Sequence, residues 1–171
     1  MDTFSFENLN AYKEAKSLVV DVYKLIAKFP QSERFALSAQ LQRAIVSVPS
    51  NIAEGSGRVS YKEKIHFLEI AYGSLMESFC QLEIACELNY ISAEELAKIK
   101  EKLKQELSEI KELIAYLKSQ VKSSLDKPRF YTTENAPSLN ALRAEVEKMP
   151  QEQVEKLKAE VNAEMFGTEN V

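Results

Sequence analysis

The segment that decides the fold is residues 41–58, whose sequence is LQRAIVSVPSNIAEGSGR. Its apolar residues recur every three or four positions, which is the spacing of a helix with one buried face. Pro49 stands inside this pattern, where it removes a backbone donor and crowds the preceding turn. We therefore predict a helix over residues 33–55 that kinks or breaks briefly near Pro49 and stops at Gly55 or Gly57.

The rest of residues 1–129 continues the helical spacing. Three further helices are predicted, bounded by Pro30, by polar turns and by two Ser-x-x-Glu capping boxes: residues 7–29, a helix that begins at Ser60 and ends before residue 89, and a helix from Ser92 to about residue 124. Four amphipathic helices are enough to bury their apolar faces against one another. The predicted fold class is all-α, an antiparallel up-and-down four-helix bundle with a C-terminal helical extension.

Residues 130–171 differ in composition from the rest of the chain. Residues 1–129 contain 18 Lys+Arg and 18 Asp+Glu, whereas residues 130–171 contain 4 and 8. After a polar linker at 132–138, apolar spacing predicts one or two short helices, which are marginal alone in water and need a docking surface. The body of the chain, a neighbouring subunit and another protein are the three alternatives. We divide the chain into a four-helix bundle at 1–129 and a linker with an acidic helical tail at 130–171.

Composition narrows the location and the class of partner. The longest apolar runs fall short of a bilayer span, and Met1 to Phe4 lack the order of a signal peptide, so we expect a cytoplasmic protein with no membrane contact. The neutral bundle argues against strong nonspecific nucleic-acid binding unless folding or assembly gathers its cations on one surface. Cys80 and Cys86 are interpreted as reduced core residues.

Candidate catalytic chemistry is sparse. His66 is the only histidine, and no nucleophile lies beside it in the sequence. The sequence Gly55-Ser56-Gly57 has neither the preceding strand nor the Gly-Lys-Ser/Thr ending of a phosphate loop. Lysines at 98, 100, 102 and 104 fall on roughly opposite sides of a helix and are interpreted as solubilising charges. We predict no catalytic site, no metal and no cofactor.

Four polar residues line one face of the second predicted helix, at spacings of four, four and three: Arg43, Ser47, Asn51 and Glu54. One interpretation is a recognition surface for a phosphate or a peptide. The interpretation we favour is structural, in which Ser47 and Asn51 satisfy backbone groups freed by Pro49, and Glu54 pairs with Arg58.

The third predicted helix carries more apolar surface than one core contact requires. Four of its apolar residues fall off the main seam: Phe67, Ile70, Met76 and Ile84. We predict that they form an oligomer interface.

Several segments resemble the four-helix-bundle proteins associated with intervening sequences of bacterial 23S ribosomal RNA genes. The likeness extends over about residues 4–120 and is most specific at Val48-Pro49-Ser50-Asn51-Ile52-Ala53-Glu54-Gly55, with further matches at 67–75. The resemblance implies a bundle that assembles as a ring-like homopentamer, with no catalytic site and a nucleic-acid or nucleoprotein role. The family's usual Arg-Arg pair before alanine is Gln42-Arg43 here, which removes one cation from an RNA surface.

These observations favour a non-enzymatic, self-assembling protein with a nucleic-acid-associated or nucleoprotein accessory role. The residues that we expect to contact phosphate are Arg43, Arg58, Lys62 and Lys64, three of which flank the turn between the second and third helices. The alternative is a protein-interaction scaffold without nucleic-acid binding, in which residues 130–171 dock a partner or a neighbouring subunit.

Overall fold

A computed structural model of the chain describes residues 4–125 and 138–166. Regular secondary structure in those residues is entirely helical, which confirms the predicted all-α class. Two short 3-10 helices and six α-helices follow one another: η1 (Ser5–Asn8), α1 (Asn10–Ile26), η2 (Gln31–Phe35), α2 (Leu37–Gly57), α3 (Tyr61–Glu87), α4 (Ala93–Leu125), α5 (Leu139–Val146) and α6 (Gln151–Phe166). No helix in the described part of the chain combines the length and the apolar content needed to cross a bilayer.

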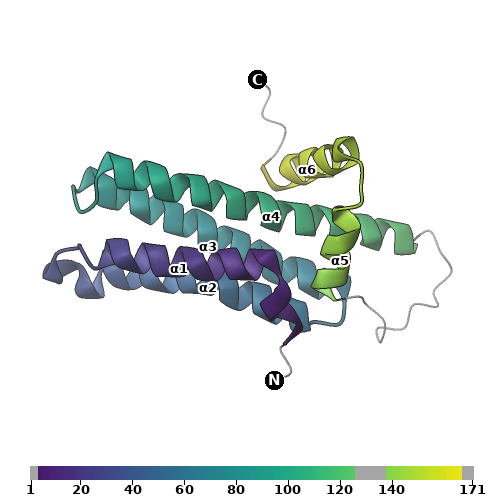
Figure 1. Ribbon diagram of the computed structural model, residues 1–171, viewed down its shortest axis with the longest axis horizontal. Coiled ribbons are helices and arrows are strands. Elements are labelled where there is room, and N and C mark those ends of the chain that lie inside the picture. Colours follow the sequence, from purple (N-terminus) through teal and green to yellow (C-terminus); the bar gives the residue numbers. More distant parts are fainter. Residues whose placement is uncertain (1–3, 126–137, 167–171) are drawn as a thin grey trace.

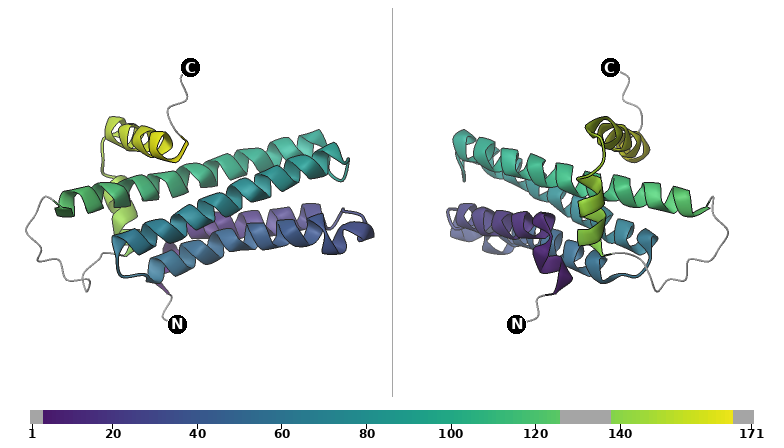
Figure 2. Two further views of the ribbon diagram at one scale, coloured as in Figure 1. Left: turned by 180° about the vertical axis from the view of Figure 1, so that it is seen from behind. Right: turned by 45° about the vertical axis from the view of Figure 1, so that its right-hand side comes forward.

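Helices α1 to α4 lie side by side along the long axis of the molecule (Figures 1 and 2). Each packs on the next, and α4 packs back on α1, so their apolar faces enclose one core. The largest fully buried side chains of this core come from α2, α3, α4 and the residue before α1: Leu9, Leu41, Ile45, Ile52, Leu68, Leu75, Leu82, Ile110, Ile114 and Leu117. Helix α1 adds buried Ala11, Ala15, Leu18, Val22 and Ile26. Burial of these residues is the main force that holds the helices together.

The observed helix boundaries follow the predicted signals closely. Ser60 Oγ accepts a hydrogen bond from the Glu63 N–H at 3.2 Å, and Ser92 Oγ accepts one from the Glu95 N–H at 3.2 Å. Both predicted capping boxes therefore open helices. Of the two predicted effects of Pro49, a kink or a brief break, the break is wrong, because α2 continues through Pro49 as far as Gly57, one of the two predicted stops.

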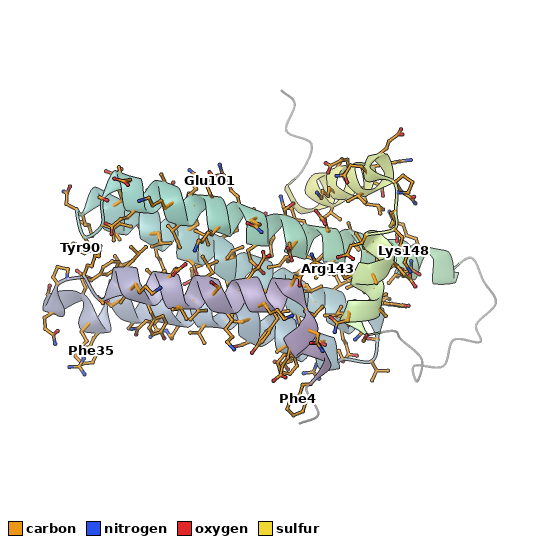
Figure 3. The ribbon with its side chains drawn as sticks, in the orientation of Figure 1. Phe4, Phe35, Tyr90, Glu101, Arg143 and Lys148 are labelled. Atoms are coloured by element: carbon orange, nitrogen blue, oxygen red, sulfur yellow. The ribbon has the colours of Figure 1, made fainter. Side chains whose placement is uncertain are left out.

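The helical tail packs on the body of its own chain. Helix α5 contacts α4 and η1 through buried Leu139, Leu142 and Val146, and α6 contacts α4. Arg143 of α5, labelled in Figure 3, places Nη1 2.7 Å from the Glu109 carboxylate of α4. Of the three docking surfaces predicted for the tail, the one found in the structure is the body of the same chain. The boundary predicted at residue 129 and most of the predicted linker lie outside the described residues.

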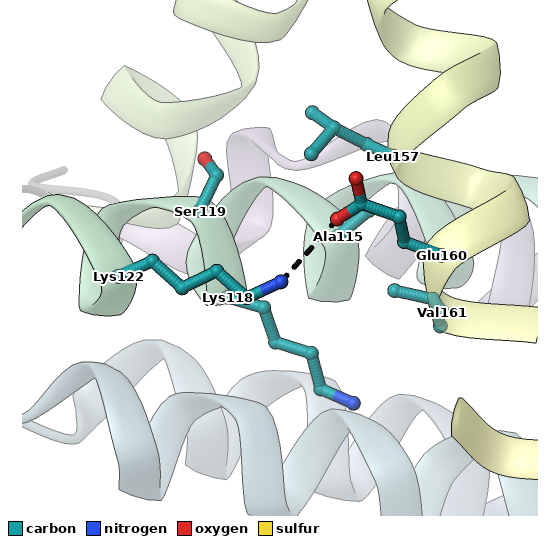
Figure 4. Close-up of a pocket in the computed structure, with 7 residues that line it drawn as sticks. All are labelled: Ala115, Lys118, Ser119, Lys122, Leu157, Glu160 and Val161. Atoms are coloured by element: carbon teal, nitrogen blue, oxygen red, sulfur yellow. Dashed lines mark hydrogen bonds and ion pairs between the residues drawn. The ribbon is translucent and has the colours of Figure 1, made fainter. Parts of the chain in front are cut away.

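Helix α6 is held on α4 by a mixture of apolar and ionic contacts. Leu157 and Val161 face Ala115, and Lys122 Nζ lies 3.3 Å from the Glu160 carboxylate across a hollow of about 30 Å³ (Figure 4). Lys118 points away from α6 toward α3, where its Nζ lies 3.4 Å from Glu69. The hollow is only large enough for a water molecule, so it offers no site for a larger ligand.

The prediction that the cysteines belong to the core is wrong for Cys80, which is exposed. Cys86 is half-buried and packs against the core, and both thiols are free. Cys80 lies four residues before exposed Ile84, on the side of α3 that faces away from the core.

A carboxyl group without hydrogen-bond partners lies where α1, α4 and α5 meet. Glu106 is 1% exposed, and neither of its carboxyl oxygens has a partner in the described residues. Burial, with added repulsion from Glu109 and Glu14, raises the pKa of Glu106 from its ordinary 4.5 to about 9, although Arg143 opposes the shift. Glu106 is therefore neutral at pH 7.

We predict that Glu106→Gln changes how stability depends on pH. The folded protein keeps the Glu106 proton up to about pH 9, whereas the unfolded chain loses it above about 4.5, so the wild-type protein loses stability as pH rises through this window. The loss is at most about 1.4 kcal/mol per pH unit. Urea unfolding at several pH values should give a flatter profile for Glu106→Gln.

Glu101→Gln is the matched control for this experiment, because Glu101 lies on the exposed outer side of the same helix (Figure 3). It should leave the wild-type profile unchanged. A Glu106→Gln profile as steep as that of the wild type would contradict the assigned protonation state.

Candidate nucleic-acid interface

The turn between α2 and α3 brings together three of the four cations predicted to contact phosphate. Arg58 follows the last residue of α2, and Ser60 caps the first turn of α3. The two helices approach closely just before this turn, because a Cβ added to Gly55 would lie 3.1 Å from the Cβ of Phe67. The turn and its charged side chains are therefore held on a close-packed helix pair (Figure 2).

Arg58 has a fixed position in this turn. Its guanidinium pairs with the carboxylate of Glu54, as predicted, and lies 4.5 Å from the centroid of the Phe67 ring. The side chain is still 39% exposed. Arginine stacked on an aromatic ring keeps donors free at its edge, so Arg58 can donate to a phosphate while it remains in place.

Lys62 and Arg43 differ in their distance from Arg58. Lys62 is exposed in the first turn of α3, four residues from Arg58. Arg43 is also exposed but lies fifteen residues earlier on α2, which corresponds to about 22 Å along the helix. Arg58 and Lys62 thus form one cationic position at the turn, and Arg43 forms a separate one.

Lys64 does not belong to this exposed set. It is 2% exposed, and its ammonium group donates a hydrogen bond of 3.1 Å to the Ser56 carbonyl at the end of α2. Burial lowers the pKa of Lys64, while the nearby Glu63 carboxylate partly opposes that change. The prediction that Lys64 contacts phosphate does not fit this geometry, since the amine joins α2 to α3 inside the protein.

The start of α3 is already occupied by acceptors from the chain itself. Ser60 Oγ accepts a hydrogen bond from the Glu63 N–H, and the Glu63 carboxylate accepts a hydrogen bond of 2.8 Å from the Ser60 hydroxyl. A helix start favours anions through its free N–H groups and its dipole. In α3 the negative charge of the Glu63 carboxylate already lies in this first turn. An incoming phosphate depends on the Arg58 and Lys62 side chains instead. The sequence spacing of the cations did not show that the negative charge of Glu63 would repel a phosphate at this turn.

Two residues of the predicted polar line have structural roles, although the partners differ in part from those predicted. Asn51 Nδ2 donates to the Ser47 carbonyl at 2.8 Å and lies 2.9 Å from Ser47 Oγ. Ser47 Oγ lies 2.8 Å from Ser74 Oγ of α3. Pro49 frees the carbonyl of Ile45, four residues earlier, but the hydrogen bonds that Ser47 and Asn51 make in the described part of the chain go to other groups. Ser47 therefore joins α2 to α3, and Asn51 holds Ser47 from within α2.

The four apolar residues predicted to form an oligomer interface fall on different sides of α3. Ile70 and Ile84 are 38% and 44% exposed and lie fourteen residues apart, close to four helical turns, on one outer strip. Phe67 is half-buried beneath Arg58, and Met76 lies beside α4. Of the four residues, Ile70 and Ile84 are therefore the two that are exposed on the same strip.

The fold defines an all-helical protein with four long helices and a helical extension packed on the fourth. A family model described as 23S rRNA-intervening sequence protein matches residues 7–116, well over half of the 171 residues, and the chain belongs to this family. The resemblance found from the sequence is thereby confirmed. A search among curated proteins gives no match.

We predict that Lys64→Ala destabilises the protein far more than Lys62→Ala does. Loss of the Lys64 amine leaves the Ser56 carbonyl without its donor, which costs about 1–3 kcal/mol. Exposed Lys62 is the matched control, and its replacement should change the free energy of unfolding by less than about 0.5 kcal/mol. Urea unfolding followed by circular dichroism measures both; equal effects would contradict the structural role of Lys64.

Proposed function

We propose that this protein is a cytoplasmic, non-enzymatic accessory component of a nucleoprotein complex. In this proposal α1 to α4 act as an antiparallel up-and-down four-helix bundle that self-associates and presents cations to nucleic acid. Membership of the 23S rRNA-intervening sequence protein family supports the proposal, since the family description links these proteins to an RNA element.

The observation that carries the nucleic-acid proposal is the pair of Arg58 and Lys62 at the turn between α2 and α3. Arg58 is fixed by Glu54 and Phe67, so little side-chain entropy remains to be lost when it binds a phosphate. Lys62 adds a second exposed charge on the first turn of α3. Arg43 extends the surface along α2 and requires a ligand longer than a single phosphate.

Self-association is proposed through the outer strip of α3. Ile70 and Ile84 expose apolar surface there, and Gly73 lies between them with nothing within 4 Å of the place where its Cβ would be. A mid-helix glycine costs about 1 kcal/mol relative to alanine. An exposed glycine between two exposed isoleucines allows another helix to approach closely. The family resemblance suggests a homopentamer as the product.

A second candidate is a protein-interaction scaffold that does not bind nucleic acid. Helix α6 contacts α4 through Val154, Leu157 and Val161, and most of its other described side chains up to Glu160 are exposed. In this alternative the exposed acidic face of the tail docks a partner protein or a neighbouring subunit.

We predict salt-dependent RNA binding that requires the cationic turn. A labelled transcript of a 23S rRNA intervening sequence should bind the wild-type protein with an affinity that falls as salt rises. Arg58→Ala with Lys62→Ala should weaken binding at least about tenfold and reduce the salt slope by about one for each lost phosphate contact. Glu63→Gln should strengthen binding, because it removes the competing carboxylate.

Lys98→Ala serves as the control for these variants, because Lys98 is an exposed lysine near the start of α4, where it pairs with Glu94. It should leave RNA affinity unchanged. Binding that neither salt nor the double substitution alters would reject the nucleic-acid proposal and leave the scaffold as the better account.

We predict that Ile84→Glu dissociates the assembly. A carboxylate on the outer strip of α3 would have to be desolvated when the strip is buried against another copy. Native mass spectrometry should show a smaller species for Ile84→Glu than for the wild type. Val20→Glu, at an exposed apolar residue of α1, is the matched control and should keep the wild-type mass. A monomeric wild-type protein would refute self-association.

A further inference from the structure

The surface between α3 and α4 contains an apolar hollow of about 160 Å³. Five apolar side chains line it: Leu75, Met76 and Phe79 from α3, and Leu103 and Leu107 from α4. An engineered protein cavity of roughly 150 Å³ is enough to bind benzene. The hollow therefore has room for one large apolar side chain, and its exposed lining is apolar throughout.

Two lysines stand at the rim of this hollow. Lys100 Nζ lies 4.7 Å from the centroid of the Phe79 ring and 3.9 Å from Glu83, and Lys104 Nζ lies 2.9 Å from Glu101. These side chains are 41–74% exposed. Ion pairs at such positions contribute only about 0–1 kcal/mol, so a carboxylate from another molecule can replace Glu83 or Glu101 at little cost.

The apolar hollow continues into a second one between α4 and α6. This neighbouring hollow, of about 400 Å³, shares Lys104 and Leu107 with the first and adds Lys111, Lys158 and Glu155. The two hollows together form a groove with an apolar floor at one end. Four lysines line the groove, and Lys158 is held by Glu112 and Glu155 at 2.7 and 3.1 Å. The lysines open to exchange of partners are Lys100 and Lys104 at the apolar end, so a ligand that combines an apolar side chain with flanking carboxylates fits there.

The chemistry of the floor distinguishes between classes of ligand. A nucleobase placed against Met76 and Phe79 would leave its polar edge without hydrogen-bond partners, which costs about 1–3 kcal/mol for each group. A leucine or phenylalanine side chain has no such edge. An amphipathic helix offers apolar side chains three or four residues apart and carries charges beside them, which suits an elongated groove.

We propose that the groove between α3, α4 and α6 binds an acidic amphipathic helix of a partner protein. One large apolar side chain of that helix enters the hollow beside Met76 and Phe79, and its flanking carboxylates pair with Lys100 and Lys104. This site is separate from the cationic turn, because it shares no residue with Arg58 or Lys62. It is also separate from the Ile70 and Ile84 strip.

The test uses the full chain and two fluorescent helical peptides. Both peptides carry leucines at helical spacing. Glutamates flank the leucines in the acidic peptide, and lysines stand in place of those glutamates in the basic peptide. Fluorescence anisotropy should show that the wild-type protein binds the acidic peptide at least about tenfold more tightly than the basic one. Lys100→Glu with Lys104→Glu should reverse this preference. Met76→Trp, which fills the hollow, should weaken binding of the acidic peptide at least about tenfold.

Lys98→Glu is the control for charge reversal on the same helix, because Lys98 does not line the groove. It should leave peptide affinity unchanged, as should Arg58→Ala. Equal binding of both peptides, or no effect of the groove substitutions, would overturn the proposal. Two further results would also overturn it: loss of RNA binding in Met76→Trp would assign the groove to nucleic acid, and loss of self-association would assign it to a second copy.

Discussion

The close contact between α2 and α3 is the constraint on which the rest of the structure depends. A Cβ added to Gly55 would crowd the Cβ of Phe67 at 3.1 Å, and the hydroxyl oxygens of Ser47 and Ser74 lie 2.8 Å apart across the same contact. Side chains this small let two helix backbones approach, and the polar groups they bring are satisfied locally. The buried Lys64 amine then ties the end of α2 to the start of α3. The contact sets the position of the turn and of the cations that it carries.

That constraint also explains why chemically similar residues have different roles. Lys62 and Lys64 are two residues apart on α3, a separation of about 200° around the helix. One therefore faces solvent while the other faces the end of α2. Arg58 is outside the helix but covers the Phe67 ring, and the Cβ of Phe67 packs closely against Gly55. A single packing contact thus produces a structural lysine, an accessible lysine and a positioned arginine.

Helical periodicity and capping boxes were sufficient to predict the helical class, the four long helices and the helical tail. Ser60 and Ser92 mark their helices because a cap is a local interaction between residues three apart. Residue roles were less predictable, since they depend on which neighbouring helix covers each face. Met76 and Ile70 both fall off the main seam of α3. Met76 lines a groove because α4 packs beside it, which the sequence of α3 does not show. Likewise, Pro49 did not break α2, because packing of the flanking apolar residues outweighs one lost hydrogen bond.

Arg143 shows why the body and the tail cannot be treated as energetically independent. Its guanidinium comes from α5, beyond the residues that match the family, and it pairs with Glu109 within them. Three carboxyl groups, those of Glu14, Glu106 and Glu109, influence one another at this position, and burial with the neighbouring Glu109 raises the pKa of Glu14 as well. The Arg143 guanidinium opposes both shifts, because its positive charge favours the ionised forms of Glu14 and Glu106. Docking of α5 therefore places a positive charge beside carboxyl groups of α1 and α4, so ionisation of these groups and attachment of the tail are coupled.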